Sequence, residues 1–186
     1  MMKKNENISQ DILLKKHLYT HKAELEIGNW KKHFDFNYVN TIIAMALNYC
    51  HKKNELIING YLITDQSLYL IVKTHEKTID TAVHQLEVQI TFLLKINPQK
   101  FKKNKYKTAF IVDDEDVFYA VRDSLFKVHP LKNNDLIGLI TGKKLTLPYH
   151  NPELEALKQI IKNHCFCSAI DYSGAIGPVP VTLLKD

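Results

Sequence analysis

Three groups of side chains in this sequence could coordinate a metal ion, and each has a simpler explanation. His164, Cys165 and Cys167 are ligand types that zinc prefers, but a structural zinc site needs a second pair of ligands, and the sequence offers none at a recognisable spacing. We therefore interpret the two cysteines as small apolar residues on one strand face. The acidic run from Asp113 to Asp116 could bind Mg²⁺, but it also fits the first turn of a helix, because acidic side chains favour the positive end of the helix dipole.

Another candidate metal group lies around a predicted hairpin. His75 follows the hairpin and His84 lies in the first turns of the helix after it, so the two imidazoles could approach each other, with Asp65 and Gln66 nearby. Surface histidines are the simpler interpretation. The sequence therefore predicts no metal site and no other cofactor.

A lysine-dense segment is the strongest candidate for binding nucleic acid. Residues 95–107 read KINPQKFKKNKYK, in which lysines can contact phosphates and two aromatic rings can stack on unpaired bases. Only one of the 25 basic residues, Arg122, is an arginine, and lysine lacks the rigid fork that reads guanine, so backbone contacts should dominate. A solvated surface loop is the alternative. The predicted contacts in this segment are Lys95, Lys100, Phe101, Lys102, Lys103, Lys105, Tyr106 and Lys107, and two further predicted contacts outside it are Lys31 and Lys32.

The composition is that of a globular protein with a sizeable core. The chain has 186 residues, of which 45% are hydrophobic and 24% charged, so disorder is excluded for most of it. Three cysteines without framework spacing do not indicate a secreted disulfide scaffold. No apolar run approaches the ~20 residues of a membrane helix, so no membrane partner is expected. The first ten residues lack the apolar centre of a signal peptide, which favours a cytoplasmic location.

The hydrophobic pattern predicts the elements that must position these side chains. Alternating apolar residues indicate strands, and apolar residues at spacings of three and four indicate helices, the first with Asp35 or Asn37 as its N-cap. The expected strands are 23–27, 56–63, 68–72 and 108–112, and the expected helices are 37–53, 78–97, 113–127 and 153–163, with 128–150 irregular. This order predicts an α+β, ferredoxin-like split βαβ sandwich, with an antiparallel sheet and helices on one face.

The same order divides the chain into three parts. Residues 1–20 read as a polar N-terminal arm, residues 21–127 as the α+β core, and residues 128–186 as a C-terminal extension that packs on the core. No internal repeat is visible in the sequence.

Three strings of this sequence resemble those of the HUH-type single-tyrosine transposases, particularly the REP-associated and insertion-sequence relatives. They are ELEIGNWKKHFDFNYVNTIIAMALNYC (24–50), NGYLITDQSLYLIVKT (59–74) and CFCSAIDYSGAIG (165–177). The resemblance implies a transposase-like fold, a homodimer, and binding of hairpin or single-stranded DNA. In that family a His-x-His pair on a strand binds Mg²⁺ or Mn²⁺, and a tyrosine on the second long helix attacks the phosphorus and becomes linked to DNA.

This chain departs from the family at each catalytic position. Ser67 and Tyr69 stand where the resemblance places the histidine pair, and neither replaces imidazole well as a metal ligand. Phe92 is the nearest match to the nucleophile and has no oxygen. We therefore expect a DNA-binding protein that does not cleave DNA. A domesticated protein-interaction module, and an enzyme that uses other residues, are the alternatives.

Overall fold

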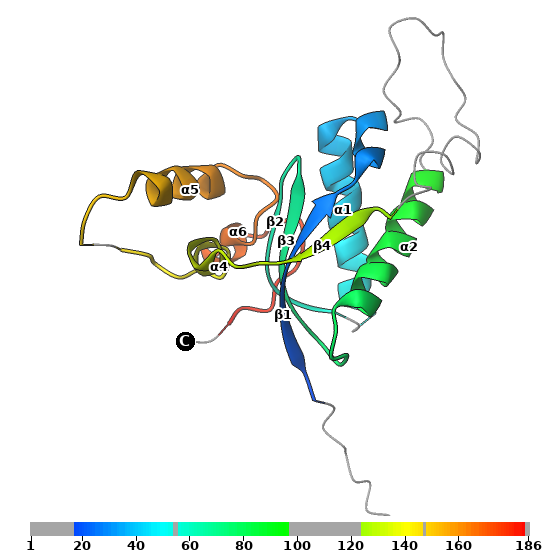
Figure 1. The fold of residues 1–186 in the computed structure, drawn as a ribbon, viewed down its shortest axis with the longest axis horizontal. Helices are drawn as coiled ribbons and strands as arrows, with labels where there is room; N and C mark the ends of the chain where they lie inside the picture. The colour runs from blue at the N-terminus through cyan, green and yellow to red at the C-terminus, as the bar shows by residue number, and fades with distance from the viewer. Residues whose placement is uncertain (1–16, 54–55, 97–123, 147, 185–186) are drawn as a thin grey trace, which may run out of the picture.

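A four-stranded antiparallel sheet organises the protein. The computed structural model describes residues 17–53, 56–96, 124–146 and 148–184. The strands are β1 (Tyr19–Ile27), β2 (Ile57–Ile63), β3 (Ser67–Thr74) and β4 (Phe126–Pro130), in the order β2-β3-β1-β4. Because α1 (Phe36–Lys52) connects β1 to β2, and α2 (Asp80–Ile96) lies between β3 and β4, each pair of strands is split by a strand of the other pair. The prediction of an α+β, split βαβ arrangement is thus confirmed (Figure 1).

The two long helices pack together on one face of the sheet. The apolar stripe of α1 is buried against inward-facing residues of β1 and β3, such as Leu25, Leu68 and Leu70. The side chain of Asp35 caps α1 by accepting a hydrogen bond from the backbone N–H of Asn37. We call this set of buried residues, which also includes Trp30 of the short helix η1 (Asn29–His33), the helix-side core.

Part of the opposite face of the sheet is covered by the C-terminal helices α4 (Asn134–Ile140), α5 (Pro152–Lys162) and α6 (Ala169–Tyr172). Because alternate strand residues point to opposite faces, Leu62 and Ile71 turn away from the helix-side core. They form a second cluster, the C-terminal core, with residues of α4, α5 and their flanking loops: Leu131, Leu136, Ile140, Ile161 and Cys167.

The chain after α5 also covers the free edge of β2. The N–H of Ile63 donates to the carbonyl of Phe166, the N–H of Ser168 donates to Tyr61, and the N–H of Thr182 donates to Ile58. These contacts satisfy backbone groups that an edge strand would otherwise leave unpaired. Among the described residues, no helix is both long and apolar enough to cross a membrane.

The largest departure from the predicted elements concerns the fourth strand. The strand expected at 108–112 and most of the helix expected at 113–127 lie outside the described residues. The end of that helix is wrong, because Phe126 begins β4. The prediction of irregular structure at 128–150 is also wrong in part, since it contains the end of β4 and all of α4. Only one of the five residues of β4 is fully buried, so its apolar signal is weak.

Candidate functional site

Polar side chains gather on the part of the second sheet face that the C-terminal helices leave open. Glu24 and Glu26 are two residues apart on the central strand β1, so both point to this face. In the register of the sheet, Glu24 lies between Tyr69 of β3 and His129 of β4, and Glu26 lies between Ser67 and Lys127. We call these side chains the polar face: Glu24, Glu26, Ser67, Tyr69, Lys127 and His129.

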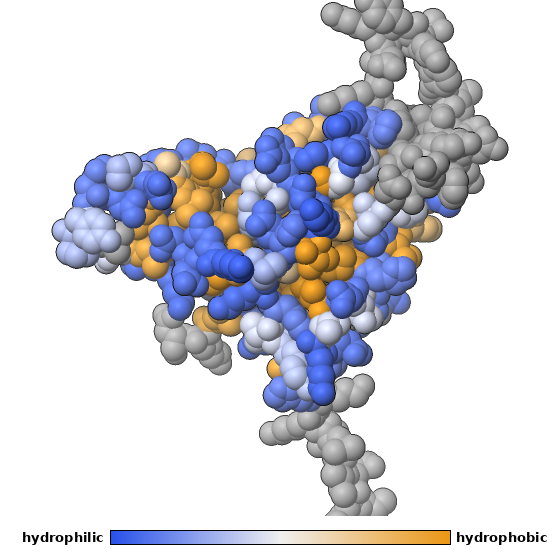
Figure 2. All heavy atoms as spheres, viewed as in Figure 1, coloured by the Kyte–Doolittle hydropathy of each residue, from blue (hydrophilic) through white to orange (hydrophobic). Residues whose placement is uncertain are grey.

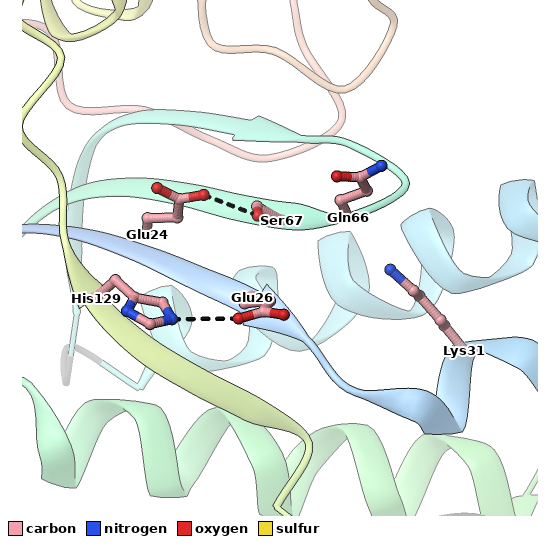
Figure 3. Close-up of a pocket in the computed structure, with 6 residues that line it drawn as sticks. All are labelled: Glu24, Glu26, Lys31, Gln66, Ser67 and His129. Atoms are coloured by element: carbon pink, nitrogen blue, oxygen red, sulfur yellow. Dashed lines mark hydrogen bonds and ion pairs between the residues drawn. The ribbon is translucent and has the colours of Figure 1, made fainter.

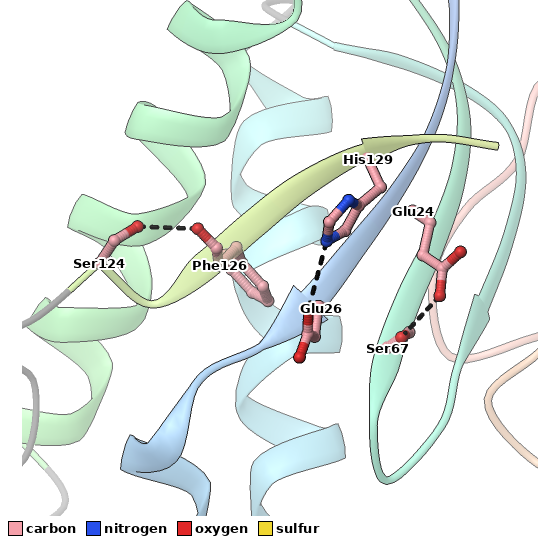
Figure 4. A network of polar contacts seen from close by, with 6 residues as sticks. All are labelled: Glu24, Glu26, Ser67, Ser124, Phe126 and His129. Atoms are coloured by element: carbon pink, nitrogen blue, oxygen red, sulfur yellow. Dashed lines mark hydrogen bonds and ion pairs between the residues drawn. The ribbon is translucent and has the colours of Figure 1, made fainter.

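Each carboxylate of the polar face accepts a hydrogen bond from its diagonal neighbour. Ser67 Oγ donates to Glu24 Oε1 at 3.0 Å, and His129 Nε2 lies 3.2 Å from Glu26 Oε2 (Figures 3 and 4). Ser67 is 4% exposed, so its position is fixed, whereas the side chain of Glu26 is 56% exposed. The half-buried carboxylate of Glu24 is therefore bonded to a buried hydroxyl, whereas the carboxylate of Glu26 faces solvent.

The polar face borders a cavity of about 380 Å³. Lys31 of η1 closes one side, and its Nζ donates to the carbonyl of Asp65 at 2.7 Å. Figure 3 shows that the side chains come from the three neighbouring strands β3, β1 and β4, from η1 and from the β2–β3 turn. The cavity is lined by Glu24, Glu26, Lys31, Gln66, Ser67 and His129.

The environment of Tyr69 disfavours its use as a nucleophile. Burial raises the pKa of Tyr69, and the nearby carboxylate of Glu24 raises it further. A phenol attacks as its phenolate, and both effects disfavour that form. The chemistry that the polar face offers is therefore hydrogen bonding and charge, with carboxylate oxygens as the main acceptors.

The candidate metal ligands of the sequence do not meet in one place. Among the described residues, no three His, Cys, Asp or Glu side chains are placed to hold a metal ion together. His75 Nδ1 contacts the carbonyl of His17, whereas His164 Nδ1 accepts a hydrogen bond from the N–H of Phe166, and burial lowers the pKa of His164. Cys167 is buried and Cys165 is exposed. The acidic run 113–116 lies outside the described residues.

The three positions that the transposase resemblance singles out fall on two sides of the sheet. Ser67 and Tyr69 belong to the polar face. Phe92 is on α2, in the layer that covers the other face, and is 54% exposed. The structure thus brings the serine and the tyrosine together with Glu24 and leaves the phenylalanine apart from them.

Three of the predicted DNA-contacting lysines lie at one end of the sheet. Lys31 and Lys32 are in η1, which follows β1, and Lys95 is in the last turn of α2. Figure 1 places η1 and the end of α2 at the same end of the molecule, which we call the lysine end. The remaining predicted contacts, residues 100–107, lie outside the described residues.

Comparisons of the chain with protein-family models, with curated proteins and with solved structures find no match. The resemblance to transposases therefore rests on the three strings quoted above and on the order of the elements.

Proposed function

We propose that this chain is a DNA-binding protein with a fold like that of the single-tyrosine transposases, and that it does not cleave DNA. The observation that supports binding is the lysine end. Lys31, Lys32 and Lys95 come from distant parts of the sequence and reach the same end of the sheet, where lysine side chains can contact successive phosphates. In the sequence, five more lysines follow between residues 100 and 107.

Two observations support binding without strand cleavage. Phe92 has no oxygen with which to attack phosphorus, and it lies on the other side of the sheet from Ser67 and Tyr69. Tyr69 does carry an oxygen, but burial and the Glu24 carboxylate raise the pKa of its phenol, which disfavours the attacking phenolate. A covalent link formed as in the family would require a hydroxyl on α2, which Phe92 does not supply.

The test is a fluorescence-anisotropy titration of hairpin and single-stranded DNA at several salt concentrations. The triple variant Lys31→Gln, Lys32→Gln and Lys95→Gln should bind single strands more weakly, and the slope of log affinity against log salt should fall by about 2, because each phosphate contact contributes ~0.7. We expect no covalent adduct on a denaturing gel, with Mg²⁺ or Mn²⁺ present.

A matched control separates specific contacts from net charge. Lys52, Lys53 and Lys77 are exposed and lie at the opposite end of the sheet, where α1 ends and after β3. Replacing these three lysines with glutamine changes the net charge equally and should leave the salt slope almost unchanged. Equal losses in both triple variants would contradict a defined binding end, and an adduct would contradict the absence of cleavage.

A surface on α2 favours a second candidate function, a protein-interaction module that pairs two copies of this chain. Val88, Phe92 and Ile96 repeat every four residues on the outer side of α2, and each is more than half exposed. Figure 2 shows hydrophobic atoms at the surface where β4 passes α2. If this stripe joins two copies, light scattering should report a dimer for the natural chain and a monomer for Phe92→Glu.

A further inference from the structure

We propose that the cavity beside the polar face binds one unpaired nucleobase that carries an amino group where thymine and guanine carry a carbonyl oxygen, that is, cytosine or adenine. The inference rests on the proposed function, because it assumes that a DNA strand lies against the lysine end. It adds which part of the strand enters the cavity and which bases are preferred there.

The charges around the cavity keep the DNA backbone out of it. Glu24 and Glu26 both line the cavity, and among the described residues the only ion pair to either carboxylate is that between Glu26 and His129. Lys31 lines the same cavity at its rim, and one of the three donors of its ammonium group bonds to the carbonyl of Asp65. A phosphate would therefore meet two carboxylates inside the cavity, and it is held better by the exposed ammonium groups outside.

The hydrogen-bonding groups of the cavity select an amino group. The bonds from Ser67 and His129 engage one oxygen of each carboxylate, and a carboxylate has about four acceptor positions on its two oxygens. Carboxylate side chains accept hydrogen bonds from the N4 amino group of cytosine, and the N6 amino group of adenine is a donor of the same kind. Thymine presents a carbonyl oxygen at the equivalent position, and that oxygen would face Glu24 or Glu26 without a donor.

The size of the cavity and its walls suit a single planar ring. A volume of about 380 Å³ lies at the lower end of the range for small-ligand pockets, ~300–1,000 Å³. The imidazole of His129 forms one wall and offers a flat surface for stacking, and the amide of Gln66 can pair with a ring edge (Figure 3). Lys31 stands at the side nearest the lysine end, where the phosphate of the bound nucleotide would lie.

The experiment compares three single strands of equal length that contain only dC, only dA or only dT. At one fixed salt concentration, the natural chain should bind the dC and dA strands ~10-fold more tightly than the dT strand, which is near the lower limit for one good base contact. In the variant Glu24→Gln with Glu26→Gln, Ser67 and His129 hold the amide oxygens, so that the amide N–H groups face the base. Affinity for dC and dA should therefore fall by a similar factor, and affinity for dT should stay equal or rise. Glutamine has nearly the same size and shape as glutamate, and circular dichroism checks that the double variant is folded.

Every other result of the experiment overturns either the inference or the proposed function. If the double variant binds all three strands more tightly and to the same degree, the carboxylates only repel DNA, and the inference is overturned. Salt-dependent binding of the natural chain without a difference among the strands overturns the inference but leaves the proposed function intact. A failure to bind any strand overturns the proposed function itself. As a control, Glu153→Gln changes an exposed carboxylate on α5, away from the cavity, and should alter none of the affinities.

Discussion

Ser168 is the residue that joins the C-terminal segment to the sheet through the most hydrogen bonds. It is fully buried, and its hydroxyl accepts a hydrogen bond from the N–H of Tyr61 at 2.8 Å. The same oxygen lies 2.5 Å from the carbonyl oxygen of Ile140 and 3.0 Å from that of Tyr61. In the tail string that resembles transposases, Ser168 and Tyr172 thus have structural partners, since the Tyr172 hydroxyl donates to the carbonyl of Asn59.

Replacing Ser168 with alanine should lower the free energy of unfolding by about 2 kcal/mol, because it leaves buried backbone groups without a partner. Urea denaturation followed by circular dichroism measures the change. Ser173→Ala is the matched control: that hydroxyl is exposed and bonds only to the nearby carbonyl of Ile170, so its loss should cost less than about 0.5 kcal/mol. Equal effects of the two substitutions would show that burial of the hydroxyl does not matter.

The sequence predicts a polar contact between two side chains well only when the two residues lie close together along the chain. The alternation of Glu24 and Glu26 identifies them correctly as the polar side of a strand, but nothing in the sequence pairs them with His129, which is more than 100 residues away. That contact depends on β4 joining β1, and the weak signal of β4 hides it. Spacing along the sequence alone therefore does not predict the cavity. The lysine-dense segment, by contrast, is visible in the sequence itself.

At the scale of elements, the strongly periodic segments are predicted closely. The helices expected at 37–53 and 153–163 occur at Phe36–Lys52 and Pro152–Lys162, and the hairpin occurs as β2 and β3. Short elements, such as α4 and β4, are the ones that the sequence misses. Tertiary contacts determine these elements more than local pattern does.

The turn after α4 provides a test of how closely α6 packs against it. Gly142 and Gly174 both have positive φ values, 77° and 89°, so alanine is strained at either position. A Cβ at Gly142 would lie 2.3 Å from the Tyr172 ring, whereas one at Gly174 would meet nothing within 4 Å. Gly174→Ala should lower the unfolding free energy by about 1–2 kcal/mol. Gly142→Ala should lower the unfolding free energy by clearly more, because the added Cβ would collide with the Tyr172 ring. Thermal denaturation of both variants measures the two losses. Equal losses would contradict close packing of α6 on this turn.

At the scale of the whole molecule, one sheet serves two cores. On β2, Tyr61 points into the helix-side core and the adjacent Leu62 points into the C-terminal core. Val179, which comes after α6, is fully buried in the helix-side core, so the end of the chain contributes to both layers. Because the two cores share strands and the C-terminal segment pairs with β2, we infer that neither layer can unfold alone.

Two natural reporters can test this inference, one in each layer. Trp30 is the only tryptophan and lies in the helix-side core, and Cys167 is buried in the C-terminal core. Burial raises the pKa of the Cys167 thiol to about 11, so in the folded protein at pH 8 this thiol is protonated and enclosed, and it should not react with iodoacetamide. In the variant Cys50→Ala with Cys165→Ser, Cys167 is the only thiol. Its reactivity should then rise at the same urea concentration at which Trp30 fluorescence changes. Labelling of Cys167 at a lower urea concentration would show instead that the C-terminal layer opens independently while the helix-side core stays folded.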